Sequence, residues 1–314
     1  MKALDLFAGT GWGVACQMLD IDEEGVEIMP EAVATREVNG MKTPYRDVWD
    51  SLLGSRRSYD LLIASPPCQT FSMAGNGAGM RSLSHVLSAI ERGVYKEPLA
   101  LHGYVEILDP RTALILTPLA HVYRDHPRLV AWEQVPTVLP VWDACADVMR
   151  GMGYSVATGV LNAEQYGVPQ TRRRAFLIAR LDAEARLPEP THSRYYAKEP
   201  SRLDPGVLPW RSIAEALQRV DSETRYTQNN KLAHQAVRFL REPAPTVTAG
   251  HDSGNRGFLD AEGVLTVATV AEVSALQSYP ASFKWQGSKT KQLLQIGNAV
   301  PPALALAILQ TLAA

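Results

Sequence analysis

A short apolar strand that stops at two prolines is the feature that most constrains this 314-residue sequence. Leu61 to Ala64 has the length and composition of a buried strand, and Pro66 and Pro67 follow almost at once. Because the second proline lacks the N–H that further pairing would need, the strand ends here and presents Cys68 in a stiff turn. Open α/β sheets bind ligands at such strand ends, so we expect an α/β fold with Cys68 at its site.

The residues that follow Cys68 predict a lid. Gly75, Gly77 and Gly79 lie in a segment with few large apolar residues, which is typical of a loop that closes over a site. A lone cysteine is otherwise most often a small buried hydrophobe. The Pro-Pro-Cys-Gln context favours a functional cysteine instead.

Composition excludes several classes of protein. Hydrophobic residues make up 46% and charged residues 20% of the chain, as in ordinary globular proteins. The formal net charge of −2 argues against a chain that is basic overall but allows a basic cleft. Cys16, Cys68 and Cys145 lie far apart, which argues against a disulfide framework or a zinc site. With no signal peptide and no apolar run of about 20 residues, we expect a cytoplasmic protein without a membrane span.

The first strands carry a glycine turn and two acids that together suggest a nucleoside cofactor. A strand-like segment ending at Phe7 leads into Gly9, Gly11 and Gly13, and a helix-like segment follows. Glycines at such a turn let a ligand approach the backbone, although this spacing does not fit the dinucleotide fingerprint. Glu27 ends the next strand, where it can accept hydrogen bonds from a ribose, and Asp47 precedes the strand that leads to Cys68. The alternative for Glu27 is an exposed surface position.

Two further strand ends carry charged groups. The strand at Leu129 to Trp132 ends on Glu133, in the same placement as Cys68, and an acid beside a nucleophile suits general acid catalysis. Further on, Gln170, Arg172 and Arg174 alternate in an extended segment, so they point to one side. Two guanidinium groups on one face suit a phosphate or a carbonyl oxygen. Short helices are expected around Leu83 to Ile90 and from Pro110 onward.

The chain ends predict two domains. Residues 181–241 are rich in proline and in mixed basic and aromatic residues, a composition compatible with nucleic-acid contact, with helices expected only at Ser212–Val220 and later at Val270–Leu276. The segment from Ala303 to Leu312 is an apolar helix that must be buried, with Asn298 as its expected cap. We therefore expect a catalytic domain of residues 1–180 plus 270–314 and an inserted small domain of residues 181–269.

Six segments in order resemble the motifs of the DNA (cytosine-5) methyltransferase family. They are Asp5-Leu6-Phe7-Ala8-Gly9, Ser65-Pro66-Pro67-Cys68-Gln69, Glu133-Gln134-Val135, Gln170-Thr171-Arg172-Arg173-Arg174, Leu276-Gln277-Ser278-Tyr279-Pro280 and Gly297-Asn298-Ala299-Val300. The resemblance implies a Rossmann-like, S-adenosylmethionine-dependent methyltransferase sheet with a small inserted target-recognition domain. It implies double-stranded DNA as the partner and methylation of a flipped-out cytosine at C5.

The resemblance also assigns residues. The implied catalytic residues are Cys68 as the nucleophile, Glu133, Arg172 and Arg174, and no metal is implied. S-adenosylmethionine, which leaves as S-adenosylhomocysteine, would be bound by Phe7, Gly9, Gly11, Glu27, Asp47, Pro67 and Asn298. The expected DNA contacts are Gln69, Ser72, Arg194, Arg202 and Arg211. A monomer is expected, in a restriction–modification pair with a cognate endonuclease or as a solitary enzyme.

Three departures from the family pattern leave alternatives open. Trp12 stands where a second glycine is usual, Gln134 replaces the usual asparagine after the acid, and residues 81–108 form a longer link than usual. Methylation of cytosine in RNA is one alternative, because a tRNA-acting branch shares these motifs. A catalytically silent DNA-binding relative is another.

Overall fold

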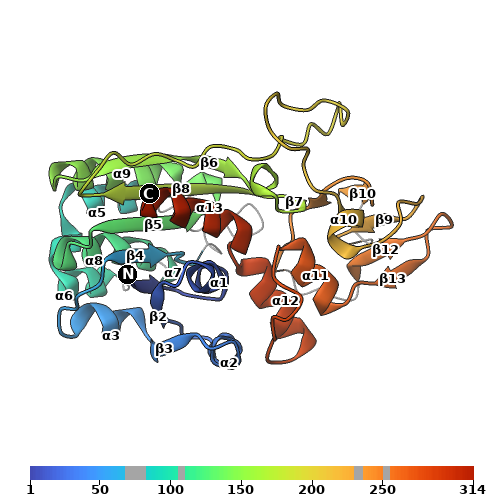
Figure 1. Cartoon of the computed structure of the whole chain (residues 1–314). Helices are drawn as coiled ribbons and strands as arrows, with labels where there is room; N and C mark the ends of the chain where they lie inside the picture. Colours follow the sequence, from blue (N-terminus) through green and yellow to red (C-terminus); the bar gives the residue numbers. More distant parts are fainter. Residues whose placement is uncertain (68–82, 105–109, 230–235, 250–254) are drawn as a thin grey trace.

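A computed structural model describes residues 1–67, 83–104, 110–229, 236–249 and 255–314. Cys68, Gln69, Ser72 and the glycines expected to form a lid lie outside the described residues. The described chain forms two lobes side by side, a larger lobe around one long sheet and a smaller lobe to its right in Figure 1.

The larger lobe is built on a seven-stranded sheet in the order β3-β2-β1-β4-β5-β8-β6. Its strands from β3 to β5 are parallel, and β8 is antiparallel to both of its neighbours. The strands are β1 Lys2–Leu6, β2 Asp22–Val26, β3 Lys42–Tyr45, β4 Leu61–Ala64, β5 Leu129–Gln134, β6 Ser155–Asn162 and β8 Arg173–Arg180. The predicted α/β class is thus confirmed.

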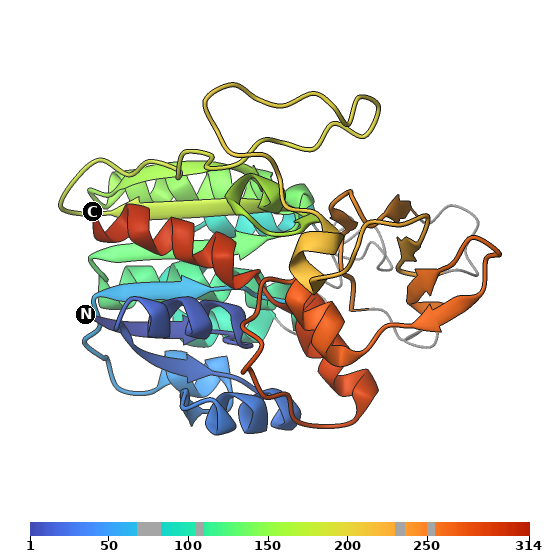
Figure 2. The same ribbon diagram turned by 45° about the vertical axis from the view of Figure 1, so that its right-hand side comes forward.

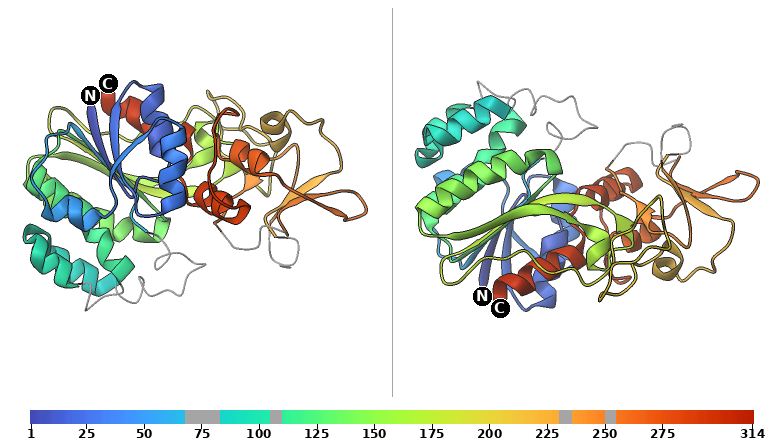
Figure 3. Two further views of the ribbon diagram at one scale, coloured as in Figure 1. Left: turned by 90° about the horizontal axis from the view of Figure 1, so that it is seen from below. Right: turned by 90° about the horizontal axis from the view of Figure 1, so that it is seen from above.

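Helices cover both faces of this sheet, which explains why β4 is apolar throughout (Figure 3). Leu62 and Ala64 pack into one core, and Leu61 and Ile63 pack into the other. The covering helices are α1 Gly11–Met18, α2 Pro30–Val38, α3 Val48–Leu53, α5 Leu83–Glu91, α6 Pro98–Gly103, α7 Pro110–Ala113, α8 Thr117–Asp125, α9 Leu139–Gly151 and α13 Pro302–Ala313. Helix α13 packs against α1, so the two ends of the chain lie in one lobe, as Figure 2 shows.

The smaller lobe has its own hydrophobic core. A four-stranded antiparallel sheet in the order β10-β9-β12-β13 packs with three helices. These elements are β9 Arg225–Thr227, β10 Val237–Phe239, β12 Gly257–Leu259, β13 Leu265–Val267, α10 Ile213–Leu217, α11 Val270–Leu276 and α12 Lys289–Asn298. Leu276 and Ile296 belong to this core, so α11 and α12 pack with the smaller sheet although they follow residue 269. The domain boundary at residue 269 stays a prediction.

Several predicted helices differ in detail from those observed. The segment after Pro110 divides into α7, the 3-10 turn Leu114–Leu116 and α8, because Pro118 in the first turn of α8 removes a backbone donor. The expected cap at Asn298 is wrong, since Asn298 is the last residue of α12 and Pro301 precedes α13. The Ser278 hydroxyl accepts the hydrogen bond from the Ala303 amide and satisfies that helix end.

The segment Lys289–Ala313 is long and apolar enough to cross a membrane by length and composition. In the structure it is two helices, because the chain between Asn298 and Pro302 is not helical. Most of its apolar window, 61%, is buried inside the protein, as expected for core helices. The two-stranded pairing of β7 Gln170–Thr171 with β11 Ala244–Pro245 joins the lobes nearby.

Candidate active site

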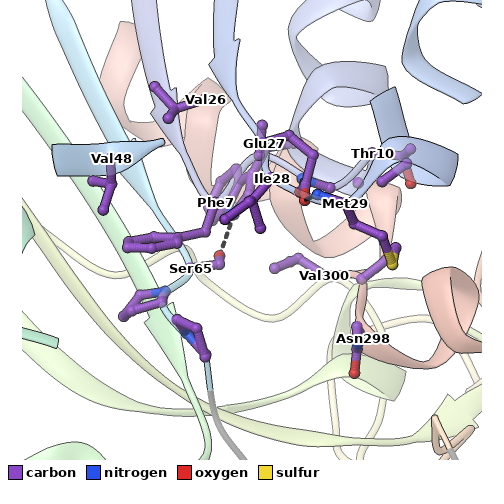
Figure 4. Close-up of a pocket in the computed structure, with 18 of the residues that line it drawn as sticks. Phe7, Thr10, Val26, Glu27, Ile28, Met29, Val48, Ser65, Asn298 and Val300 are labelled. Atoms are coloured by element: carbon purple, nitrogen blue, oxygen red, sulfur yellow. Dashed lines mark hydrogen bonds between the residues drawn. The ribbon is translucent and has the colours of Figure 1, made fainter. Parts of the chain in front are cut away.

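A cavity of about 370 Å³ opens at the carboxyl edge of the parallel strands. Figure 4 shows Phe7, Val26 and Val48 toward one end and Asn298 toward the other. Most of the residues predicted from the sequence line it, namely Phe7, Gly9, Gly11, Glu27, Asp47, Pro67, Glu133, Arg174 and Asn298. The structure therefore brings together residues that are up to 291 positions apart, from Phe7 to Asn298.

At one end of the cavity, two carboxylates are fixed by backbone amides. Glu27 accepts hydrogen bonds from the amides of Gly9 at 2.9 Å and Met29 at 2.8 Å. Asp47 caps α3 by accepting from the Trp49 amide at 2.9 Å through one oxygen. These bonds hold both acids in place, and both side chains line the cavity with further acceptor capacity to spare.

A buried ion pair, which the sequence did not indicate, fixes the turn after β1. Phe7 and Gly9 both have positive φ, at 60° and 48°, the left-handed region that favours glycine. Arg36, fully buried, donates to the Gly9 carbonyl at 3.1 Å and pairs with buried Glu23 at 2.7 Å. Asp5 is also fully buried, and burial raises its pKa well above its usual range, with Glu23 adding to the rise. Its neutral form suits this setting.

Glycine is required at position 11 by packing. A side chain there would place its Cβ 1.9 Å from the Val300 carbonyl oxygen, so α1 could not pack against the start of α13. Nearby, the hydroxyls of Thr10 and Tyr279 are hydrogen-bonded at 2.5 Å. The glycine turn and the carboxyl-terminal motif therefore form one wall of the cavity.

Glu133 and Arg174, which also line the cavity, form an ion pair. Arg174 Nε lies 2.8 Å from Glu133 Oε1, and both side chains are largely buried. Burial raises the pKa of Glu133, while Arg174, Arg172 and a hydrogen bond from Ser65 oppose that rise. A carboxyl group with a raised pKa, facing a cavity, is the arrangement that a general acid needs.

The end of β4 is tied to β5 beside this pair. The side-chain amide of Gln134 donates to the Pro66 carbonyl at 2.6 Å. Pro67, the last described residue of the nucleophile motif, lines the cavity. The chain thus leads from the Glu133 side of the cavity directly to the position of Cys68 in the sequence.

Arg172 and Arg174 have different partners, although the sequence predicted them to point to one side. The Arg172 guanidinium is buried and donates to the carbonyls of Val247, Gly297 and Ala299 at 2.8 to 3.1 Å. Arg172 therefore ties the larger lobe to the segment just after β11, at Val247, and to the junction between α12 and α13.

Gln170 and Gln277 complete this buried network. Gln170 accepts from the Val247 amide at 2.9 Å and donates to the Leu276 carbonyl at 2.8 Å. Gln277 donates to the carbonyls of Ile296 and Ala299. Sequence reasoning assigned no role to Gln277, and its place in the Leu276-to-Pro280 motif was the only signal available.

Arg194, Arg202 and Arg211 do not line the cavity. They are exposed in the long connection between β8 and α10, whose loop projects at the top of Figures 1 and 2. Arg194 and Arg202 lie near Tyr196, with Arg202 4.1 Å from the ring centroid. Asp204 fixes the loop by accepting from the Tyr196 hydroxyl and the Arg194 amide.

Among the described residues no cluster of three or more acidic, histidine or cysteine side chains could hold a metal ion.

A cavity at the carboxyl edge of a mostly parallel sheet, in which β8 is the one antiparallel strand, defines a Rossmann-like α/β fold, and solved methyltransferase structures share this fold. The chain belongs to the C-5 cytosine-specific DNA methylase family, whose model matches residues 1–94, 106–255 and 208–314. The resemblance inferred from the six motifs is thereby confirmed.

Individual relatives agree over nearly the whole chain. The Type II methyltransferase M1.HphI of Haemophilus parahaemolyticus is 28% identical, covering 97% of this chain and 84% of its own. The Type II methyltransferase M.AplI of Arthrospira platensis is 28% identical, covering 98% and 84%. Among solved structures, S. pombe Dnmt2 methyltransferase has a TM-score of 0.64 at 20% identity, covering 99% and 98%, and shares the fold.

Proposed function

We propose that this protein transfers a methyl group from S-adenosylmethionine to C5 of a flipped-out cytosine in duplex DNA by covalent catalysis through Cys68. The observation that carries the proposal is the buried Glu133–Arg174 pair facing the cavity into which β4 leads Pro66 and Pro67. Membership of the family supports methylation of cytosine in DNA.

The residues that line the cavity fit S-adenosylmethionine. Phe7, Val26 and Val48 offer an apolar surface to an adenine ring, and Glu27 beside them offers acceptors for a ribose diol. Asp47 retains one oxygen for an exocyclic amine, and Asn298 and Pro67 also line the cavity. Bound there, the cofactor would supply an electrophilic methyl group and depart as S-adenosylhomocysteine.

The residues of this chain account for activation of the base. The Cys68 thiolate adds to C6 of cytosine, and the C5–C6 electron pair becomes available at C5 for methyl transfer. Glu133 donates its proton toward N3 as negative charge develops there, and Arg174 holds the O2 carbonyl and Glu133 itself. Solvent water then takes the C5 proton, the C5–H electrons re-form the C5–C6 double bond as the C6–S bond to Cys68 breaks, and N3 returns its proton to Glu133. Cys16 and Cys145 are buried with raised pKa values, so neither fits the nucleophile.

Arg172 has a supporting place in this proposal. Two of its three bonds to backbone carbonyls hold the α12–α13 junction, which contributes Asn298 and Val300 to the cavity. We assign Arg174 to the substrate and Arg172 to positioning this wall.

We also propose that residues 181–269 form the target-recognition domain, with Gln69, Ser72, Arg194, Arg202 and Arg211 as DNA contacts. The names of the curated relatives as Type II methyltransferases support a role beside a cognate restriction endonuclease. A monomer acting on DNA in the cytoplasm is consistent with this role.

The test is methyl transfer from tritiated S-adenosylmethionine to a duplex DNA library and to bulk tRNA, with Cys68→Ser as the control. We expect label in duplex DNA alone and none with the variant, whose cofactor affinity should be nearly unchanged. A target duplex with 5-fluorocytosine should become covalently attached in a form that resists denaturation, because fluorine cannot leave as the proton does. Label in tRNA alone would overturn the DNA substrate, and turnover by Cys68→Ser would overturn the covalent step.

A further inference from the structure

Trp12 is a buried indole in the first turn of α1, at a position where the family resemblance predicts glycine. Its exposed fraction is 1%, and it lines the cavity from the side of α1. Its ring meets Phe176 edge-on, with centroids 6.4 Å apart. Phe176 is the neighbour of Glu133 across the β5–β8 pairing, so the indole is packed against the strand that supports the acid.

The indole also reaches the end of β4. Trp12 Nε1 donates to the Ser65 hydroxyl oxygen at 3.0 Å, and Figure 4 shows this bond at Ser65. An indole N–H can only donate, so the Ser65 oxygen acts as the acceptor in this contact. The β4–β5 register pairs Ala64 with Trp132, so Ser65 and Glu133 are the next residues side by side, and both line the cavity. The single hydroxyl proton of Ser65 then remains for the Glu133 carboxylate.

We infer that Trp12 is a positioning residue for Glu133, acting through Ser65 in the chain of hydrogen bonds Trp12 to Ser65 to Glu133. The inference rests on the proposed function for its catalytic meaning. A glycine at position 12 has no side-chain donor, so this chain orients its acid by a contact that the usual family residue cannot make. Trp12 thus does more than narrow the cavity.

The charges and hydrogen-bond donors around Glu133 determine how its pKa should respond when the chain of hydrogen bonds from Trp12 is broken. Arg174 and Arg172 approach from β8 and the adjoining β7 segment, and Ser65 approaches from the end of β4. All three favour the ionised carboxylate, whereas burial favours the protonated form. Removing the Ser65 bond should therefore raise the pKa of Glu133. Removing Trp12 should raise it less, because Ser65 keeps its proton but loses the partner that fixes its direction.

The experiment compares Ser65→Ala, Ser65→Thr, Trp12→Phe and the double variant Trp12→Phe/Ser65→Ala. The pKa of Glu133 is read from ¹³C-glutamate NMR spectra, with the Glu133 signal assigned by its absence in Glu133→Gln. We expect an upward shift of about one pH unit in Ser65→Ala, a smaller one in Trp12→Phe, and recovery in Ser65→Thr. The basic limb of the kcat profile should move in the same direction, since Glu133 acts in its protonated form, and kcat should fall by about three- to tenfold.

Trp285→Phe is the matched control. Trp285 also donates to a serine hydroxyl at 3.0 Å, that of Ser274, in the smaller lobe. Its loss should leave the Glu133 signal unchanged. The inference is overturned if Trp12→Phe leaves the pKa of Glu133 unchanged. It is also overturned if Trp12→Phe shifts this pKa by the same amount in the wild-type and in the Ser65→Ala background, because the effect would then not pass through Ser65. Because the NMR titration needs no turnover, it tests the link from Trp12 through Ser65 to Glu133 even if the proposed methyl transfer fails.

Discussion

The side-chain amide of Gln134 lies 2.6 Å from the main-chain carbonyl oxygen of Pro66. The β4–β5 register pairs Ala64 with Trp132, so two residues further on Pro66 and Gln134 lie side by side. Regular pairing stops there, because the prolines lack N–H donors. Gln134 therefore extends the link between the strands with its side chain, at Pro66, a residue two positions before Cys68.

This link predicts the effect of Gln134→Asn. The shorter amide cannot reach the Pro66 carbonyl while its oxygen still accepts from the Val135 amide, as the glutamine does. We expect the single-turnover rate to fall by about ten- to a hundredfold, the cost of a displacement near 1 Å at a reacting group. Cofactor affinity, measured by calorimetry, should change little.

Gln292→Asn is the control for this change. Gln292 also donates to a backbone carbonyl, that of Gly287 at 2.8 Å, but on the exposed surface of the smaller lobe. It should have wild-type kinetics. An unchanged or faster rate for Gln134→Asn would mean that the loop adapts to either length.

Arg172 and Arg174 should separate in a paired test of stability and rate. Replacing Arg172 with methionine removes three hydrogen bonds and leaves the carbonyls of Val247 and Gly297 without this donor, while Ala299 keeps the one from Gln277, so the free energy of unfolding should fall by about 3 kcal/mol. Arg174→Met leaves Glu133 without its ion-pair partner in the cavity, so chemistry should slow by at least about a hundredfold. Urea denaturation and single-turnover kinetics distinguish the two. Equal loss of stability and rate in both variants would contradict the assignment.

The sequence predicts the strand ends well because local chemistry decides them. The proline pair after Ala64, the acid after Trp132 and the glycines after Phe7 each act within a few residues. The partners of Arg172 could not be found this way, because Val247 and Ala299 approach only after both lobes fold.

The same limit applies to the smaller lobe and to the cofactor turn. Strands β9 and β10 have three residues each, too short for a periodic pattern to reveal them. The Arg36–Glu23 pair behind Gly9 looks like surface charge in the sequence, and only tertiary packing shows that it is buried.

Stability should depend on pH through Glu164, which is buried beneath the projecting loop. Burial raises its pKa from 4.5 to about 7, opposed by hydrogen bonds from the amides of Tyr195 and Arg172 and by Arg194. The folded state thus holds this proton more tightly than the unfolded chain. Its stabilising effect is full below about pH 4.5 and is lost as the pH rises through about 7, a change of about 3 kcal/mol.

Glu164→Gln should remove this dependence. Denaturant midpoints measured from pH 5 to pH 8 should fall less steeply than in the wild type, so that the variant is the more stable protein at pH 8. The exposed Glu262→Gln serves as the control and should follow the wild-type curve. Parallel curves for Glu164→Gln and wild type would show that the carboxyl group titrates normally.

The last prediction concerns the choice among DNA sequences. Glu133 and Arg174 face the cavity, so they act on one base and do not distinguish its neighbours. Arg202 is exposed on a loop whose shape Asp204 fixes, so its guanidinium is available without a large ordering cost. If Arg202 contacts a base, Arg202→Ala should reduce the discrimination between target and non-target sequences by about 1–3 kcal/mol. If Arg202 contacts a phosphate, the substitution should weaken binding to all duplexes and lower the slope of log affinity against log salt concentration by about one.

Arg128→Ala is the matched control for this substitution. Arg128 is an exposed arginine paired with Asp182, and it precedes β5, at the end of that strand opposite to Glu133. Sequencing of methylated DNA and binding across a salt series should show no change in this variant. The same measurements on Arg194→Ala and Arg211→Ala extend the test along the connection between β8 and α10. The methylated motif and the affinity could instead stay constant in all three arginine variants and change on substitution within residues 81–108. Sequence choice would then lie in that longer link, because recognition requires side chains that reach base edges.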